Sequence, residues 1–131
     1  MIENVVVPGW PRPRGYSNGV VATGRTLYVA GQIGWEPDGT FVHRDFIGQF
    51  DRALGNVLQV VEAAGGGPEH VVRLTIYVTD LDAYRNDLAR VGEIYRRRMG
   101  KVFPAMALVG VAGLVEQQAL VEIEATASLP G

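Results

Sequence analysis

Two carboxylates near the end of the chain occupy positions where an acid is both costly and chemically useful. In the segment ALVEIEATA, residues 119–127, strict alternation puts Glu122 and Glu124 on one face of a predicted strand and aliphatic side chains on the other. A carboxyl flanked by aliphatic residues is disfavoured in its charged form unless hydrogen bonds or cations compensate. Such a group is a usable general acid or base near neutral pH. We therefore take Glu122 as the candidate catalytic residue.

Both acids also have a structural interpretation. For Glu122 the alternative is an ion pair with an arginine across a subunit boundary, and the two interpretations stay open. For Glu124, two residues further along the same face, a solvated or inter-subunit ion pair is the simpler interpretation. In either case a strand with an acidic face is not buried on both sides, so that face meets water, a ligand or another subunit.

No other residue pattern supplies a familiar reactive group. His43 and His70 have no acid or histidine partner at ligand spacing, so we expect no metal site. The chain has no cysteine, which excludes disulfides and thiolate chemistry and makes the cytoplasm the default compartment. The glycine run at 65–67 ends a predicted helix instead of opening one, so it is not a phosphate loop. No dinucleotide fingerprint is present, and we expect no cofactor.

Composition indicates one globular domain spanning residues 1–131. The chain is 47% apolar, which suits a folded protein with a sizeable core. A net charge of −2 argues against general nucleic-acid binding, and Arg96–Arg98 complement the dipole at the end of a predicted helix. The longest apolar run, residues 103–115, is too short to span a bilayer, and the acidic Glu3 does not suit a signal peptide. We expect neither a membrane nor a nucleic acid as a partner.

The order of hydrophobic patterns predicts a ββαβαββ arrangement, an α+β fold with two helices on one face of a mixed sheet. Residues up to about Arg14 are rich in proline and should form an extended arm. Asp45 is the expected cap of the first helix. The predicted elements are strands at 19–22 and 27–32 joined as a hairpin, a helix from Asp45 to about Ala64, a strand at 71–79, a helix from about Asp82 to Gly100, and two closing strands within 103–127.

Two helices cover only one face of such a sheet. The strands carry too many apolar residues for the other face to be fully wet. We therefore expect the protein to associate with itself through that open face.

Several segments, in their order and spacing, resemble the Rid/YjgF family, once called L-PSP endoribonucleases. The likeness covers nearly the whole chain. It implies the YjgF/chorismate-mutase-like fold and a homotrimer with a barrel-like centre and ligand clefts between adjacent subunits. The segments that carry it are YSNGV (16–20), VAGQI (29–33), VVRLTIYVTDL (71–81), VGEIY (91–95), and FPAMALVGVAGL (103–114) followed by VEIEA (121–125).

The resemblance also implies roles for individual residues. Glu122 stands where the family's deaminases keep a glutamate that orients the attacking water. Tyr16, at an offset of one residue, matches the family's site tyrosine. Ala30 stands where the family often has a hydroxyl residue, and Gly31 beside it would let a ligand approach the main chain. Gly92 stands where some members carry an asparagine.

Met106 is the main departure from the family pattern. Active imine deaminases of the RidA type have an arginine at this position, after Pro-Ala, where it clamps the substrate carboxylate. A thioether cannot hold a carboxylate, so the standard small imine should bind poorly, and the pocket becomes more apolar. Arg12, Arg14 and the Arg96–Arg98 group are candidate replacement anchors, but the sequence does not place them near Glu122.

Two hypotheses follow from these residues. The first is a cofactor-independent Rid-type hydrolase that adds water to the C=N bond of a small imine or enamine-derived metabolite. The alternative is a non-catalytic trimer that binds a small metabolite or a partner protein through the same cleft. The presence of Glu122 among aliphatic residues, where its charged form is disfavoured, favours the hydrolase. The missing arginine favours the binder.

Overall fold

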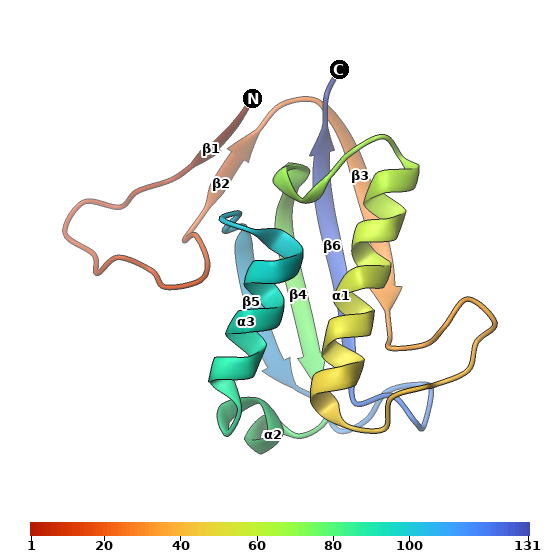
Figure 1. Ribbon diagram of the computed structural model, residues 1–131. Helices are drawn as coiled ribbons and strands as arrows, with labels where there is room; N and C mark the ends of the chain where they lie inside the picture. Colours follow the sequence, from red (N-terminus) through yellow and green to blue (C-terminus); the bar gives the residue numbers. More distant parts are fainter.

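The protein is built on a four-stranded mixed sheet whose helices pack on one face (Figure 1). The computed structural model describes residues 1–131. The strand order is β3-β6-β4-β5, in which β4 and β5 are parallel and the other two pairings are antiparallel. The predicted α+β class and mixed sheet are confirmed. The elements are β3 (Arg25–Gln32), α1 (Phe46–Ala63), a 3₁₀ turn (Pro68–His70), β4 (Val71–Val78), α2 (Leu81–Arg85), α3 (Leu88–Met99), β5 (Ala105–Gly110) and β6 (Val121–Leu129).

The N-terminal residues form a separate two-stranded ribbon of β1 (Ile2–Asn4) and β2 (Val20–Ala22). The predicted hairpin is therefore wrong, because β2 pairs with β1 while β3 pairs with β6. The chain passes from one sheet to the other at Gly24. The φ angle of Gly24 is +137°, a value that residues with a side chain rarely adopt. A Cβ at Gly24 would also lie 2.4 Å from the main-chain oxygen of Leu129.

The second predicted helix is two helices in the structure. The Asp80 side chain caps α2 by accepting hydrogen bonds from the N–H groups of Asp82 and Ala83, at 3.0 and 3.4 Å. The chain then leaves the helix at Asn86 and Asp87 and starts α3. Asp and Asn side chains compete for nearby backbone groups, which favours such breaks and is invisible to hydrophobic periodicity.

The long helix α1 covers the core side of the sheet. As predicted, Asp45 caps it, with Oδ2 accepting from the N–H of Gly48 at 3.4 Å. The apolar residues at helical spacing are at most 7% exposed. The buried stripe consists of Phe46, Phe50, Leu54, Val57 and Val61.

No helix of the protein combines the length and the apolar character that crossing a membrane requires.

A buried amide connects α1 to the start of β6. Gln49 is 1% exposed; its Nε2 donates to the main-chain oxygens of His43 and Gln118, at 3.1 and 2.9 Å. Its Oε1 accepts from the N–H of Leu120 at 2.8 Å. Because Leu120 lies two residues before Glu122, this amide helps to position the acidic strand on the helix layer.

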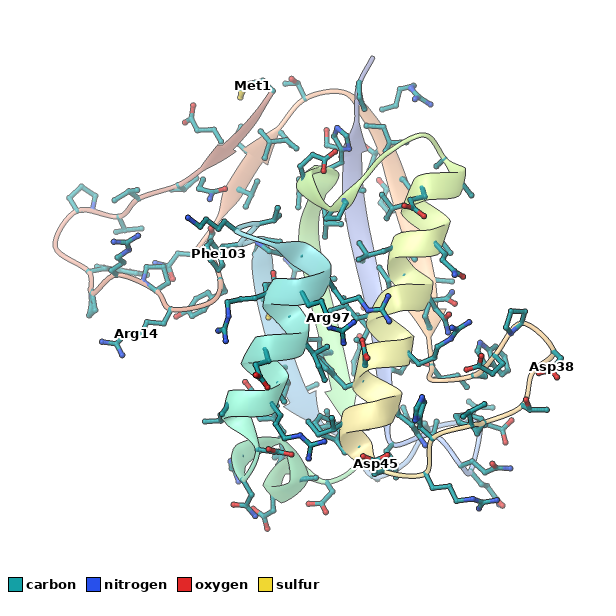
Figure 2. The ribbon with its side chains drawn as sticks, viewed as in Figure 1. Met1, Arg14, Asp38, Asp45, Arg97 and Phe103 are labelled. Carbon is teal, nitrogen blue, oxygen red and sulfur yellow. The ribbon has the colours of Figure 1, made fainter.

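Two arginines of the basic run join α3 to α1, and Figure 2 shows Arg97 between the two helices. Arg97 Nη2 and Arg98 Nε each donate to the carboxylate of Asp51 at 2.8 Å. Burial alone would raise the pKa of Asp51, but the two hydrogen bonds and the positive charges of Arg97 and Arg98 together hold the pKa below its ordinary value. Gly55 leaves room for the contact, since a Cβ there would lie 2.7 Å from Arg98 Nη1. Arg97 and Arg98 are therefore structural residues.

The face of the sheet opposite the helices is not covered by any part of the chain (Figure 1). On β6 the predicted alternation is confirmed: Val121 and Ile123 are 0% exposed, while Glu122 and Glu124 point to the other side and are half-buried. On the same open face Tyr28 of β3 is 78% exposed. A large aromatic side chain this exposed on a sheet is typical of a surface that meets another molecule.

Candidate functional site

Glu122 lies directly against the main chain of β3. A Cβ built on Gly31 would fall 2.7 Å from the carboxyl carbon of Glu122 and 2.9 Å from its Oε2. The pairing of β3 with β6 is irregular between Val29 and Gln32, so Ala30 and Gly31 stand outside the regular register. Gly31 thus opens the space in which the Glu122 carboxyl rests. We had expected the open space at Gly31 to admit a ligand; in the structure the Glu122 carboxyl occupies it.

The two acids of β6 have different surroundings. Glu124 Oε1 accepts a hydrogen bond from Tyr77 Oη at 2.7 Å. This hydrogen bond, partial burial and the negative charges of Glu124 and Glu122 raise the pKa of Tyr77 above its ordinary value, against a smaller opposing effect of Arg73. Tyr77 therefore stays a phenol and a donor at neutral pH. Glu122 has no hydrogen-bond or ion-pair partner within the chain, so its carboxylate is free to accept from water or a ligand.

Met106 lies on the other side of the sheet from Glu122. In the parallel pairing of β4 and β5 it is in register with Leu74, which is 0% exposed and faces the helices. Met106 is partly buried against the same core cluster. In contrast, Glu122 is in register with Tyr77 on the open face. Within one chain the two residues do not face a common pocket.

Gly92 lies in the helix layer that Met106 faces, and Tyr16 lies in the N-terminal loop beside β5. Tyr16, 41% exposed, belongs to the N-terminal loop, which joins β5 through the next residue, Ser17. The N–H of Ser17 donates to the main-chain oxygen of Pro104 at 3.0 Å, and its hydroxyl donates to that of Phe103. Gly92 lies on α3, where a Cβ would meet Arg96 Nη1 at 3.3 Å.

The predicted site residues therefore fall into two groups on different elements. We call Ala30, Gly31 and Glu122 the carboxylate half-site, and Tyr16, Gly92 and Met106 the methionine half-site. The strands β3 and β5 that carry part of each group are the two opposite edges of the sheet. One chain alone does not bring the half-sites together.

Of the remaining histidines and arginines considered from the sequence, some have structural roles and others line an accessible hollow. His70 Nδ1 accepts from the N–H of Gly67 at 2.9 Å and so closes the turn before β4. The ring of His43 packs where a Cβ on Gly48 would stand, 2.6 Å from Nδ1. Arg12 and Arg14, in contrast, line a hollow in the N-terminal loop together with Tyr16.

Sequence reasoning overlooked Tyr77 as a site residue. Tyr77 lies within the strand predicted at residues 71–79, but it was assigned no role. The missing information is the register of β4 against β6, which sets Tyr77 beside Glu122 and within hydrogen-bond reach of Glu124. Tyrosine on a strand next to an acidic strand is a weak signal that could have pointed to this pair.

Comparisons with known proteins agree on one family. Residues 11–129 match the family model described as Endoribonuclease L-PSP. A RutC family protein of Pyrococcus horikoshii is 34% identical over 128 residues, which cover 97% of this chain and 98% of that protein. The human 2-iminobutanoate/2-iminopropanoate deaminase is 35% identical over 128 residues, covering 97% of this chain and 88% of the human protein. The crystal structure of YyfB from Yersinia pestis, a Rid-family protein of unknown function, is similar with a TM-score of 0.85 and 32% identity, covering 98% of both chains.

Proposed function

Because this chain belongs to the endoribonuclease L-PSP family, which includes the Rid and RutC proteins, we propose that it is a hydrolase that removes ammonia from a small imine. The observation that carries the proposal is the Glu122 carboxylate, which rests on Gly31 without a partner of its own. The human relative, named for its deamination of 2-iminobutanoate and 2-iminopropanoate, supports the same class of reaction.

The reaction needs only water and one carboxylate. Glu122 accepts a proton from water as the water oxygen bonds to the carbon of the protonated imine, and the C=N double bond becomes a single bond in a neutral amino alcohol. The protonated carboxyl returns this proton to the nitrogen. The carboxylate then takes the hydroxyl proton as the C=O bond forms and the C–N bond breaks, and it passes that proton to the departing ammonia, which leaves as ammonium. Imine plus water thus becomes ketone or aldehyde plus ammonia, with Glu122 unchanged. Positioned acid–base catalysis of this kind contributes roughly 10²–10⁴-fold.

We further propose that the site is completed between copies of the chain. The carboxylate and methionine half-sites lie at opposite edges of one sheet, so a neighbouring copy is needed to set one beside the other. The uncovered sheet face, with Tyr28 at 78% exposure, supplies a surface for such an assembly. The homotrimer that the family resemblance implies would form three equivalent sites of this kind.

Met106 determines which imine is accepted. A partly buried thioether offers no hydrogen bond to a carboxylate beside the reacting carbon. The methionine half-site therefore favours a substrate with a larger apolar portion and holds the smallest imino acids weakly.

A panel of imines tests the proposal. Each imine is generated in situ by an amino-acid oxidase, and semicarbazide traps whatever escapes hydrolysis. We expect the purified protein to reduce trapping of bulky apolar imines at lower concentration than it does for 2-iminopropanoate. Trapping that is unchanged for every imine would contradict the hydrolase and favour a non-catalytic binder.

A further inference from the structure

The N-terminal loop encloses a hollow that the hydrolytic step does not use. Residues 5–19 leave β1, turn at Gly9 and Gly15, where φ is +85° and +81°, and return to β2 (Figure 1). The hollow that they form with Phe103 has a volume of 1010 Å³. Small-molecule sites range from about 300 to 1000 Å³, so the hollow is large enough for a metabolite.

The loop is held at both ends. The N–H of Val5 donates to the main-chain oxygen of Gly19 at 2.9 Å and closes the neck of the loop. The buried Ser17 fastens the returning segment to Pro104 and Phe103. Prolines at 8, 11 and 13 fix φ along the arm and leave fewer conformations to lose when a ligand binds.

The walls of the hollow are aromatic and remain exposed. Trp10 is 63% exposed, Tyr16 41% and Phe103 37%. Figure 2 shows Phe103 where β5 begins and Arg14 at the outer, lower edge of the N-terminal loop. Aromatic side chains gathered around one concavity offer stacking surface to a planar ligand.

The charge in the hollow has one sign. Arg12 and Arg14 are the charged residues of its lining, and no acid lines it. Neither arginine forms an ion pair or a hydrogen bond within the chain, whereas Arg97 and Arg98 are both bound to Asp51. On a chain of net charge −2, two unpaired guanidinium groups beside aromatic walls match an anionic aromatic ligand.

We propose that this hollow binds the carboxylate and the aromatic ring of the substrate. Arg12 and Arg14 hold the carboxylate, and the ring lies against Trp10, Tyr16 and Phe103. The inference rests on the proposed function, because the hollow supplies the anchor that Met106 cannot. One residue of its lining, Phe103, lies three residues before Met106 in the chain. The substrate class is then the imine of an aromatic amino acid.

Binding is tested without turnover, with Trp10 as the reporter. The chain has two tryptophans, so Trp35→Phe leaves Trp10 as the single source of tryptophan fluorescence. The probes are 3-phenylpropionate, its amide, which lacks the charge, and propionate, which lacks the ring. We expect saturable quenching by 3-phenylpropionate and binding at least about tenfold weaker for both other probes, because each lacks one half of the match.

Variants of the arginines complete the test. In the Trp35→Phe background, Arg12→Gln with Arg14→Gln should weaken 3-phenylpropionate binding at least about tenfold while leaving the melting temperature unchanged. The matched control is Arg44→Gln with Arg85→Gln, which removes the same charge from exposed positions outside the hollow and should bind as before.

Equal binding of the acid and its amide, or unchanged binding by the Arg12/Arg14 variant, overturns this inference. Neither result touches the hydrolase proposal, which depends on Glu122. Conversely, retained binding with no acceleration of imine hydrolysis would leave the hollow as a ligand site and remove the proposed function.

Discussion

Replacing Glu122 by glutamine should lower kcat for the proposed imine hydrolysis by roughly 10²–10⁴-fold, the share that positioned acid–base catalysis supplies. Glutamine has almost the same shape, so it fits the space above Gly31. Its amide cannot take the proton from the attacking water. Because the side chain has no partner within the chain to lose, the free energy of unfolding should change little. Single-turnover rates with the trapping assay, together with urea unfolding, measure both quantities.

Glu124→Gln is the matched control. It makes the same replacement of a carboxylate by an amide at the other acid of the same strand face. The new amide oxygen can still accept the hydrogen bond from Tyr77. We expect kcat within about threefold of the parent, as for a surface substitution that keeps its hydrogen bond. Equal losses for Glu122→Gln and Glu124→Gln would show that the charge of the face matters and that no single carboxylate is catalytic.

Replacing Gly31 by alanine should reduce kcat by about a hundredfold, because displacing a catalytic group by about an ångström has an effect of that size. The new methyl group would stand 2.7 Å from the Glu122 carboxyl carbon, which is closer than real Cβ contacts. The carboxyl is the far end of a flexible side chain, so it moves aside and the strand pairing survives. The loss should therefore appear in kcat, with little change in the melting temperature.

Gly113→Ala controls for the general effect of a glycine substitution. Gly113 is exposed, and a Cβ there meets nothing within 4 Å. Its activity should match that of the parent protein. If Gly31→Ala also retained the parent kcat and KM, the position of the Glu122 carboxyl on β3 would have no part in catalysis.

Hydrophobic periodicity was sufficient to predict the elements that carry the site. The alternation around Glu122 identified β6 and assigned its two faces correctly, since Val121, Ile123 and Ala125 are buried in the hydrophobic core. The helix at 46–63 followed from its cap and its stripe. These features are local, and a single stretch of sequence encodes each of them.

Pairing between distant strands was not predictable in the same way. The partner of β2 is β1, a strand of three residues whose pattern carries too few positions to show alternation. The irregular register at Ala30 and Gly31 depends on β6, about ninety residues away in the chain. For the same reason the sequence did not show that Tyr77 and Glu124 are hydrogen-bonded.

The separation of the half-sites became apparent only from the strand order. Glu122 and Met106 are sixteen residues apart in sequence and on strands that both contact β4. Their side chains nonetheless point to opposite faces, because Met106 shares its register with Leu74 and Glu122 with Tyr77. A linear pattern does not encode which faces of two strands coincide.

Mixed assemblies test most directly whether the site forms between copies. Glu122→Gln inactivates the carboxylate half-site, and Gly92→Trp should block the methionine half-site with a bulky side chain on the surface of α3. The two variants are expressed together with different tags, and assemblies that carry both tags are purified. In a cyclic trimer that contains both variants, one site in three joins the two intact half-sites, so roughly a third of the parent activity should return. Activity no higher than that of either variant alone, or full activity of Gly92→Trp by itself, would contradict a site shared between neighbouring chains.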